Sequence, residues 1–202
     1  MMTTPPEVTR QKEQLARFLA RQETEGFKEP PVRLSTYLQL HQQRRLWWLR
    51  GNCAGRILEV GCSWGYVLAL CKGHVGVDEN PDTIALASIL SPDKEFHVAN
   101  ATALPFQDAE FDTVMLPEVL EHMPWEEVSL ALSEAARCAR RWLLVTMPDG
   151  EHETQDAINI KHAWLCTTQK LAEILLTLDK LGFVTRTQRQ AGFWLIEANR
   201  SR

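Results

Sequence analysis

The sequence predicts an α/β fold built on a seven-stranded, mostly parallel sheet with helices on both faces. Short apolar runs alternate along the chain with amphipathic helical segments, the order typical of parallel strands joined by crossover helices. The last two apolar runs are joined instead by a short polar stretch containing Gly192, which predicts an antiparallel C-terminal hairpin. We expect a domain over residues 51–202, preceded by an N-terminal helical extension over residues 1–50.

Each expected element follows from periodicity and from the residues that start or stop it. Strands are expected at residues 56–60, 75–77, 95–99, 112–116, 142–147, 183–187 and 193–198. Helices are expected at residues 10–23 and 34–49 in the extension, and at 65–72, 81–90, 125–139 and 168–181 in the domain. Asn80-Pro81 is a helix start signal, Pro124 opens the next helix, and Gly182 is placed to cap the last one.

The most informative local pattern is a glycine turn followed by an acidic strand end. The apolar run ending at Val60 leads into Gly61-x-Ser63-x-Gly65, and the next short strand ends at Asp78. In open parallel sheets, ligands bind beyond the carboxyl ends of the strands. A glycine turn lets backbone approach the ligand, and an acid at the second strand end can accept hydrogen bonds from ribose hydroxyls. The pattern therefore predicts a nucleoside-like cofactor.

The spacing of this turn selects among such cofactors. It is not the Gly-x-Gly-x-x-Gly of dinucleotide sites, and no Gly-x-x-x-x-Gly-Lys-Ser/Thr occurs in the chain. Glu59, two residues before Gly61, would repel a phosphate but suits a cationic ligand. S-adenosylmethionine, with its ammonium, sulfonium and adenosine, fits these features.

Four motifs in order resemble class I S-adenosylmethionine-dependent methyltransferases, over roughly residues 55–200. They are Glu59-Val-Gly61-Cys-Ser-Trp-Gly65 with Asp78, Asn100 to Phe106, Phe111-Asp112, and Glu118-Val-Leu-Glu121-His122. The resemblance implies a Rossmann-like fold and a cofactor site formed by Glu59, Gly61, Cys62, Gly65, Asp78, Glu79, Asn100, Ala101 and Leu116. It also implies that the N-terminal extension can act as a lid over the active site.

Two positions depart from the pattern of that family. Ser63 stands where the family usually has a glycine, and it is small enough to keep the turn. Asn100 stands where the family usually has an aspartate facing adenine. Its carbonyl can still accept from the adenine amine. We therefore expect Asn100 beside the adenine ring, and we expect Asn100→Asp to preserve or improve cofactor binding.

The candidate catalytic residues are Glu118, Glu121 and His122, after the fourth strand. The spacing i, i+3, i+4 would put all three on one face of a helical turn. His122 is the best general base, because the unperturbed pKa of histidine is about 6.5. An alternative is a divalent metal held by these residues with His162 or His152. The site expected from the sequence is one without a metal.

The function expected from these features is methyl transfer to an oxygen of a small molecule, and three alternatives exist. Gly61-x-Ser63-x-Gly65 is formally the nucleophile elbow of α/β-hydrolases, but no oxyanion loop precedes it and Asp78 follows too soon to be a triad acid. Similarity to small-RNA 3′-terminal ribose 2′-O-methyltransferases leaves a metal-assisted RNA enzyme open. A non-catalytic cofactor-binding partner subunit is the third reading.

Charge and cysteine content bear on partners and location. The net charge is −4, with +5 over residues 10–50 and −8 over residues 51–202, and an acidic domain argues against nucleic acid. Five cysteines without a Cys-x-x-Cys predict reduced thiols in the cytoplasm rather than disulfides or zinc. The first ten residues lack a signal-peptide core and no run is long enough to span a membrane. An oligomer is compatible with these features.

Overall fold

The computed structural model describes residues 40–150 and 163–200, all within one compact unit that covers residues 35–202. The strands are β1 (Ile57–Val60), β2 (Val75–Asp78), β3 (Glu95–Val98), β4 (Phe111–Pro117), β5 (Ala139–Pro148), β6 (Phe183–Gln190) and β7 (Phe193–Arg200). The helices are α3 (Leu40–Asn52), α4 (Tyr66–Leu70), α5 (Pro81–Leu90), the 3₁₀ turn η1 (Leu120–His122), α6 (Trp125–Cys138) and α8 (Thr168–Lys180). The helix predicted at residues 10–23 lies outside the described residues.

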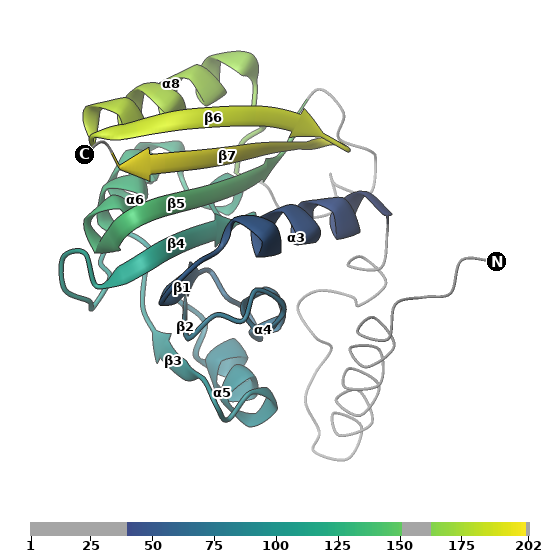
Figure 1. The fold of residues 1–202 in the computed structure, drawn as a ribbon, viewed down its shortest axis with the longest axis vertical. Helices are drawn as coiled ribbons and strands as arrows, with labels where there is room; N and C mark the ends of the chain where they lie inside the picture. Colours follow the sequence, from purple (N-terminus) through teal and green to yellow (C-terminus); the bar gives the residue numbers. More distant parts are fainter. Residues whose placement is uncertain (1–39, 151–162, 201–202) are drawn as a thin grey trace. The chain divides into compact units, whose positions relative to one another are not determined.

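The strands form one seven-stranded sheet in the order β3-β2-β1-β4-β5-β7-β6 (Figure 1). β7 runs antiparallel to both of its neighbours, and the other strand pairs are parallel. The predicted α/β fold, with its antiparallel C-terminal hairpin, is confirmed. Strand order reverses at β1, which lies between β2 and β4, so the carboxyl ends of these three strands meet at the place where such sheets bind ligands.

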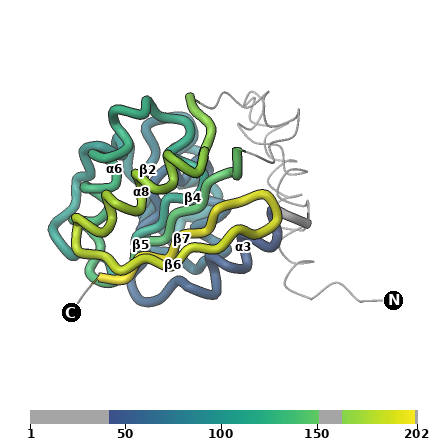
Figure 2. Tube along the Cα trace, turned by 90° about the horizontal axis from the view of Figure 1, so that it is seen from above, coloured from purple at the N-terminus to yellow at the C-terminus, as the bar shows by residue number. Residues whose placement is uncertain are grey.

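Helices cover both faces of the sheet, as predicted, and the core is divided accordingly (Figure 2). Leu58, Val114 and Val145 belong to a cluster that includes buried residues of α6 and α8. Met115 and Leu144, adjacent to two of them along the strands, belong to a second cluster with residues of α3 and α4. Neighbouring strand residues point to opposite faces, so nearly continuous apolar strands bury both of them.

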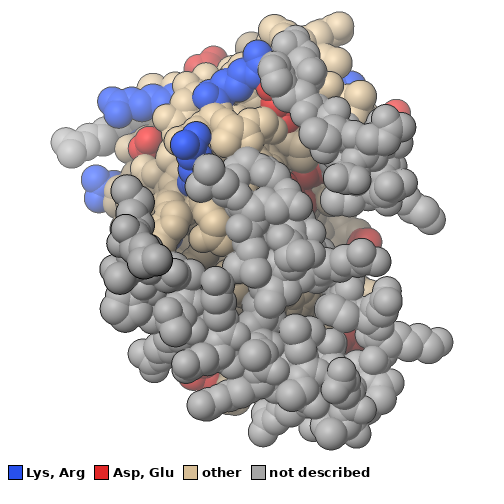
Figure 3. All heavy atoms as spheres, turned by 90° about the vertical axis from the view of Figure 1, so that its right-hand side faces the viewer, with Lys and Arg blue, Asp and Glu red and all other residues tan. Residues whose placement is uncertain are grey.

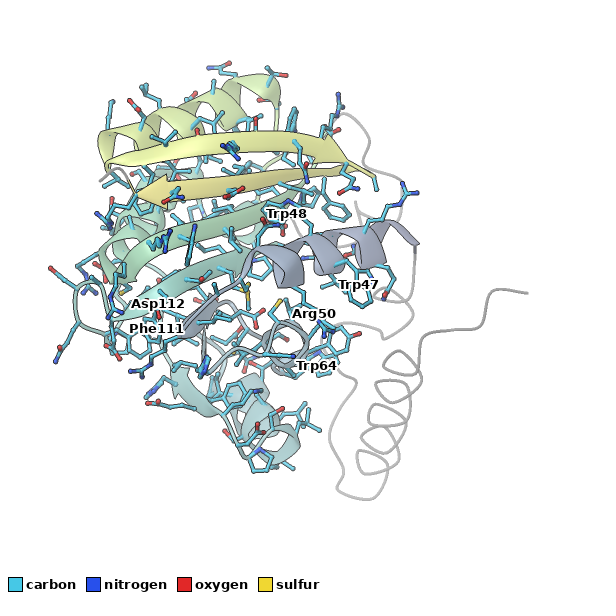
Figure 4. All side chains as sticks on the ribbon, in the orientation of Figure 1. Trp47, Trp48, Arg50, Trp64, Phe111 and Asp112 are labelled. Atoms are coloured by element: carbon cyan, nitrogen blue, oxygen red, sulfur yellow. The ribbon has the colours of Figure 1, made fainter. Side chains whose placement is uncertain are left out.

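Helix α3 packs on the sheet through one of its two tryptophans. Trp48 packs against the second core cluster, whereas Trp47 is 45% exposed and stacks with Arg50, whose Cζ lies 5.3 Å from the ring centroid. Figure 4 shows Trp47 and Trp48 pointing to different sides of the helix. Trp48 is therefore the tryptophan that docks this helix on the sheet. The helix ends at Asn52, three residues after the predicted end, and residues 34–39 of the prediction lie outside the described residues.

The turn between β6 and β7 explains the position of Gly192. Ala191 and Gly192 both have positive φ, at 54° and 86°. Two consecutive left-handed residues match the twist of a hairpin, and glycine adopts this conformation without steric cost. The short turn is what lets β7 insert beside β5 in the antiparallel direction.

Candidate functional site

The turn after β1 is built from three residues with left-handed backbone. Gly61, Ser63 and Gly65 have φ values of 70°, 48° and 81°. The departure at Ser63 is thus accommodated in the conformation that a glycine would adopt most easily, at a modest cost for a serine. The amide of Cys62 donates to the Val77 carbonyl at 2.8 Å, which ties the turn to β2.

Gly61 also lacks room for a side chain. A Cβ at this position would lie 2.5 Å from Cγ2 of Val119, the residue that follows Glu118 at the end of β4. A Cβ at Gly65 would lie 3.0 Å from the ring of Phe96. The glycines therefore serve close packing between neighbouring strand ends as well as the positive φ.

Asp78, at the end of β2, organises the same turn. Its Oδ2 accepts from the Ser63 amide at 2.8 Å, and its Oδ1 accepts from the Asn80 amide at 3.0 Å and the Thr83 hydroxyl at 3.2 Å. The side chain is held in one orientation, and a carboxylate has about four acceptor positions. Acceptor capacity remains for a ribose hydroxyl, which fits the predicted role.

Glu59, in β1 beneath the turn, is a buried acid with an unsatisfied oxygen. The residue is 1% exposed, and its Oε2 has no hydrogen-bond partner within residues 40–150 and 163–200. Burial raises the pKa of Glu59 well above its ordinary value, and the nearby Arg45 charge opposes that rise. A buried carboxyl without a partner is costly, so this atom is suited to meet the cation of a bound ligand.

Arg45, on α3, is a site residue that the sequence did not single out. Its side chain is 1% exposed and its Nη2 lies 3.0 Å from Oε2 of Glu118. Its Nη1 donates to the Thr146 hydroxyl at 3.3 Å and its Nε donates to Gln42 Oε1 at 3.0 Å. The guanidinium links the first described helix to the ends of β4 and β5. Only the fold brings these segments together, so spacing gave no signal.

The three candidate catalytic residues do not share one helical face, contrary to the expectation from their spacing. Glu118 precedes the 3₁₀ turn and has φ 55°, with its amide donating to the Thr146 carbonyl at 2.9 Å. Glu121 is 2% exposed, whereas His122 is exposed. A left-handed residue interrupts the helical spacing, so the i, i+3, i+4 rule does not apply. Glu118 and His122 remain beside the carboxyl end of β4.

The segment beginning at residue 163 is anchored to this region. The Ala163 amide donates to the Glu121 carbonyl at 2.7 Å, and Trp164 Nε1 donates to the Met123 carbonyl at 3.1 Å. The ammonium of Lys170 lies 4.5 Å and 4.7 Å from the ring centroids of Trp125 and Trp164. These contacts fix the entry to α8 against η1 and α6.

At the end of β3, the side chain of Asn100 is already engaged. Its Oδ1 accepts from the amide and the hydroxyl of Thr102 at 2.9 and 2.7 Å. Its Nδ2 donates to Oε2 of Glu79 at 3.2 Å. The carbonyl that the sequence assigned to the adenine amine is therefore occupied, and a carboxylate stands beside it.

The remaining predicted cofactor residues differ in accessibility. Cys62 is 3% exposed and burial raises the pKa of its thiol, while its sulfur packs toward Gly76. Ala101 is partly buried against the core, and Leu116 is 0% exposed within it. In a cofactor site, Cys62 and Leu116 would therefore contribute through their backbone and their packing. Within the described ranges, no three His, Cys, Asp or Glu side chains group as a metal site, and His152 and His162 lie outside those ranges.

Helix α3 itself carries basic residues, in line with the positive charge of residues 10–50. This helix contains no acidic residue, and Arg44 and Trp47 are exposed on it. Figure 3 shows several Lys and Arg side chains in the upper part of the face that lies on the right-hand side of Figure 1. Among the helices of residues 40–150 and 163–200, none is long and apolar enough to cross a membrane.

The glycine turn, the acid ending β2 and the strand reversal at β1 are features of open α/β sheets that bind nucleoside cofactors. A family model described as a methyltransferase domain matches residues 58–142. A probable S-adenosylmethionine-dependent methyltransferase of Mycolicibacterium smegmatis is 32% identical over 97 residues, covering 46% of this chain and 37% of that protein. A Mycobacterium tuberculosis protein described in the same words is 31% identical over 108 residues, covering 50% and 39%. Residues 58–142 thus resemble a methyltransferase domain, and the chain spans under half the length of the curated relatives that it matches.

Solved structures show how widely this fold is shared. Magnesium protoporphyrin IX methyltransferase of Synechocystis with bound SAH has a TM-score of 0.64 at 20% identity, covering 96% of this chain and 99% of that one. The [4+2]-cyclase SpnF has a TM-score of 0.66 at 16% identity, covering 86% and 84%. At such identities the likeness shows the fold alone, and the second protein shows that the fold also hosts cyclase chemistry.

Proposed function

We propose that this protein uses S-adenosylmethionine to methylate a small-molecule acceptor, at oxygen. The observation that carries the proposal is the pairing of Glu59 with Asp78 at adjacent strand ends. One is a buried carboxyl with an unmatched oxygen, and the other is an oriented carboxylate with remaining acceptor capacity. Their chemistry fits the ammonium and the ribose of a single bound cofactor.

The chain itself supplies binding and orientation. S-adenosylmethionine, when bound, supplies a methyl group activated by positive sulfur. Asp78 would hold the ribose, Glu59 would face the ammonium, and the glycine turn would allow the backbone to approach the ligand. Proximity and orientation of this kind can provide much of the rate enhancement.

On the acceptor side, we assign proton removal to His122. It is exposed and follows the strand end whose backbone and side chain are fixed by Thr146 and Arg45. An oxygen acceptor must lose a proton during transfer, and a neutral imidazole is suited to take it near neutral pH. Glu118 and Glu121 would support this edge of the site by charge and packing rather than by proton transfer.

Calorimetry with S-adenosylhomocysteine tests the proposal at the level of the cofactor. We expect one site per chain, and no heat at millimolar ligand would overturn the assignment. Transfer is tested with S-adenosylmethionine labelled on the methyl group and a panel of small hydroxylated acceptors. Binding without transfer to any acceptor, in the full-length protein, would favour the cofactor-binding subunit instead.

A further inference from the structure

A group of buried polar side chains lies beneath α3, at the carboxyl ends of the strands. Ile57 and Leu144 belong to the core cluster on this face of the sheet, together with Leu46 of α3. Side chains two positions apart on a strand share a face, so Glu59 and Thr146 continue this face toward the ends of β1 and β5. Both are buried. The face that is apolar in the middle of the sheet therefore becomes polar where the cofactor is proposed to bind.

Helix α3 brings one cation to this polar end of the face. Just after the helix, Cys53 Sγ lies 3.8 Å from Sδ of Met115 in β4. About two turns earlier, Arg45 reaches the strand ends instead, with Nη2 3.0 Å from Glu118 Oε2 and Nη1 donating to the Thr146 hydroxyl. Because Glu59 pairs in register with Met115, Arg45 lies over the ligand end of both strands.

The charges in this group do not balance. Arg45 supplies one positive charge against two acids, Glu118 and Glu59. Glu118 holds Arg45 in a direct ion pair, whereas Oε2 of Glu59 has no hydrogen-bond partner within residues 40–150 and 163–200. Burial raises the pKa of Glu59, and the charge of Arg45 opposes that rise. With both acids ionised, the three side chains would carry one excess negative charge, which the ammonium of the cofactor would balance.

The other groups that interact with Glu59 supply no further cation. They come from the elements packed around it: Cys53 after α3, Leu68 and Cys71 in and after α4, Asp78 in β2 and Cys62 in the glycine turn. Asp78 adds negative charge, and the contact with Leu68 is a backbone hydrogen bond. Burial raises the pKa of the Cys62 thiol, and a hydrogen bond with Cys53 raises that of Cys71. Arg45 is thus the one cation among these described groups.

We propose that Arg45 is a positioning residue shared by two acids: it holds Glu118 at the end of β4, and its charge favours the carboxylate form of Glu59 that binds the ammonium of the cofactor. The inference rests on the proposed function, in which Glu59 meets that ammonium. Removing the charge of Arg45 would favour the protonated form of Glu59. Removing the charge of Glu118 would leave the guanidinium uncompensated and favour the ionised form. The two changes should therefore move the ionisation of Glu59 in opposite directions.

Calorimetry with S-adenosylhomocysteine at a series of pH values tests these directions. This ligand carries the ammonium and needs no acceptor. In the wild type, we expect affinity to rise with pH and to level off where Glu59 is already ionised without ligand. We expect Arg45→Gln to move this levelling point up by about one pH unit, and Glu118→Gln to move it down by about one unit. Arg45→Lys keeps the charge and should stay within about half a unit of the wild type.

Arg137→Gln is the matched control. Arg137 pairs with Glu134 at 2.8 Å within α6, and its loss should leave the levelling point unchanged. Shifts in the same direction in Arg45→Gln and Glu118→Gln, or no shift in either, would overturn the proposal, because a purely structural ion pair has no reason to give opposite signs. If Arg45→Gln does not fold, the sign of the shift in Glu118→Gln decides alone. A wild-type affinity that does not change with pH would also overturn the proposal, whereas absence of binding would refute the proposed function.

Discussion

The amino ends and the carboxyl ends of the central strands carry the same residue types, but these residues make different interactions. At the amino end of β1, Asp112 Oδ2 accepts from the Arg56 amide at 2.8 Å and its Oδ1 pairs with Arg140 at 2.9 Å. At the carboxyl end, Asp78 accepts from the turn but stands beside Glu59, which has an unmatched oxygen. Figure 4 shows Phe111 and Asp112 far from Trp64, which lies in the glycine turn.

The glycines repeat this contrast. A Cβ at Gly55 would lie 2.3 Å from Asp112 Oδ2, and a Cβ at Gly61 would lie 2.5 Å from Val119. Both glycines have positive φ and approach a neighbouring side chain closely. Gly55 lies against Asp112, whose hydrogen-bond partners Arg56 and Arg140 both belong to the chain. Gly61 instead follows Glu59 by two residues, and Oε2 of Glu59 has no hydrogen-bond partner within residues 40–150 and 163–200. A site is thus recognised by what is left without a partner, more than by its residue types.

The largest expected effect is on turnover, and it distinguishes His122 from His74, which lies at the opposite end of the strands. His122→Ala should lower turnover about 10²–10⁴-fold with little change in cofactor affinity, because a general base acts only in the chemical step. In steady-state kinetics across pH, wild-type turnover should rise near the pKa of a histidine, and the residual turnover of His122→Ala should lack this rise. His74→Ala is the control, since His74 Nδ1 accepts from the Ile57 amide at the other edge and should affect stability alone. Unchanged turnover in His122→Ala would remove it from catalysis.

The next effect separates the two glycines. Gly61→Ala should weaken S-adenosylhomocysteine binding about 100-fold, because the methyl group pushes Val119 and the end of β4 out of place. Gly55→Ala should lower the melting temperature but preserve affinity in the folded fraction. Gly182→Ala, with φ 84° and no atom within 4 Å of its Cβ, reports backbone strain alone. Equal losses of binding in Gly61→Ala and Gly55→Ala would contradict the proposed difference between the two ends of the strands.

A smaller effect separates the two aspartates. Asp78→Asn should weaken cofactor binding about 10–100-fold, the value of a hydrogen bond to a charged group. Asp112→Asn should leave binding unchanged and cost about 1 kcal/mol or less of stability, since the group is largely solvated.

The Asp112 control has its own pH signature. The Arg56 amide, and then Arg140, hold the pKa of Asp112 below its ordinary value. A lowered pKa stabilises the folded state above the ordinary carboxyl pKa, and this contribution is lost as pH falls through the folded-state value. The difference in melting temperature between wild type and Asp112→Asn should therefore shrink in acid. A constant difference across pH would contradict the ionic role.

The smallest expected effect concerns Glu59. Burial raises the pKa of Glu59, so without ligand its carboxyl keeps its proton to a higher pH than an ordinary glutamate, whereas a cationic ligand favours the carboxylate. Binding should release a proton, so affinity should rise with pH below that pKa by at most about tenfold per unit. Calorimetry in buffers of different ionisation enthalpy measures this proton, and Glu59→Gln should abolish it. Proton uptake on binding would refute the assignment.

The sequence sufficed for the elements and for the glycine turn because these depend on local chemistry. Asn80 accepts from the Asp82 amide as the expected helix cap, and Gly182 follows α8 with positive φ. The sequence misjudged the residues after β4, because Glu118 adopts a left-handed conformation with φ 55°, which interrupts the helical spacing. It also assigned the Asn100 carbonyl to adenine, whereas Thr102 takes that carbonyl and Glu79 takes the amide.

Sequence alone determined the fold class, the glycine turn and the acidic strand end at Asp78. Apolar periodicity, glycines and acidic strand ends are written within a few residues of one another, so they can be read without contacts. Only the tertiary structure joined Arg45 to Glu118 and Thr146, which are up to 101 positions apart. Only burial made Glu59 a carboxyl in need of a partner, because desolvation depends on everything packed around a group and on nothing in its own spacing.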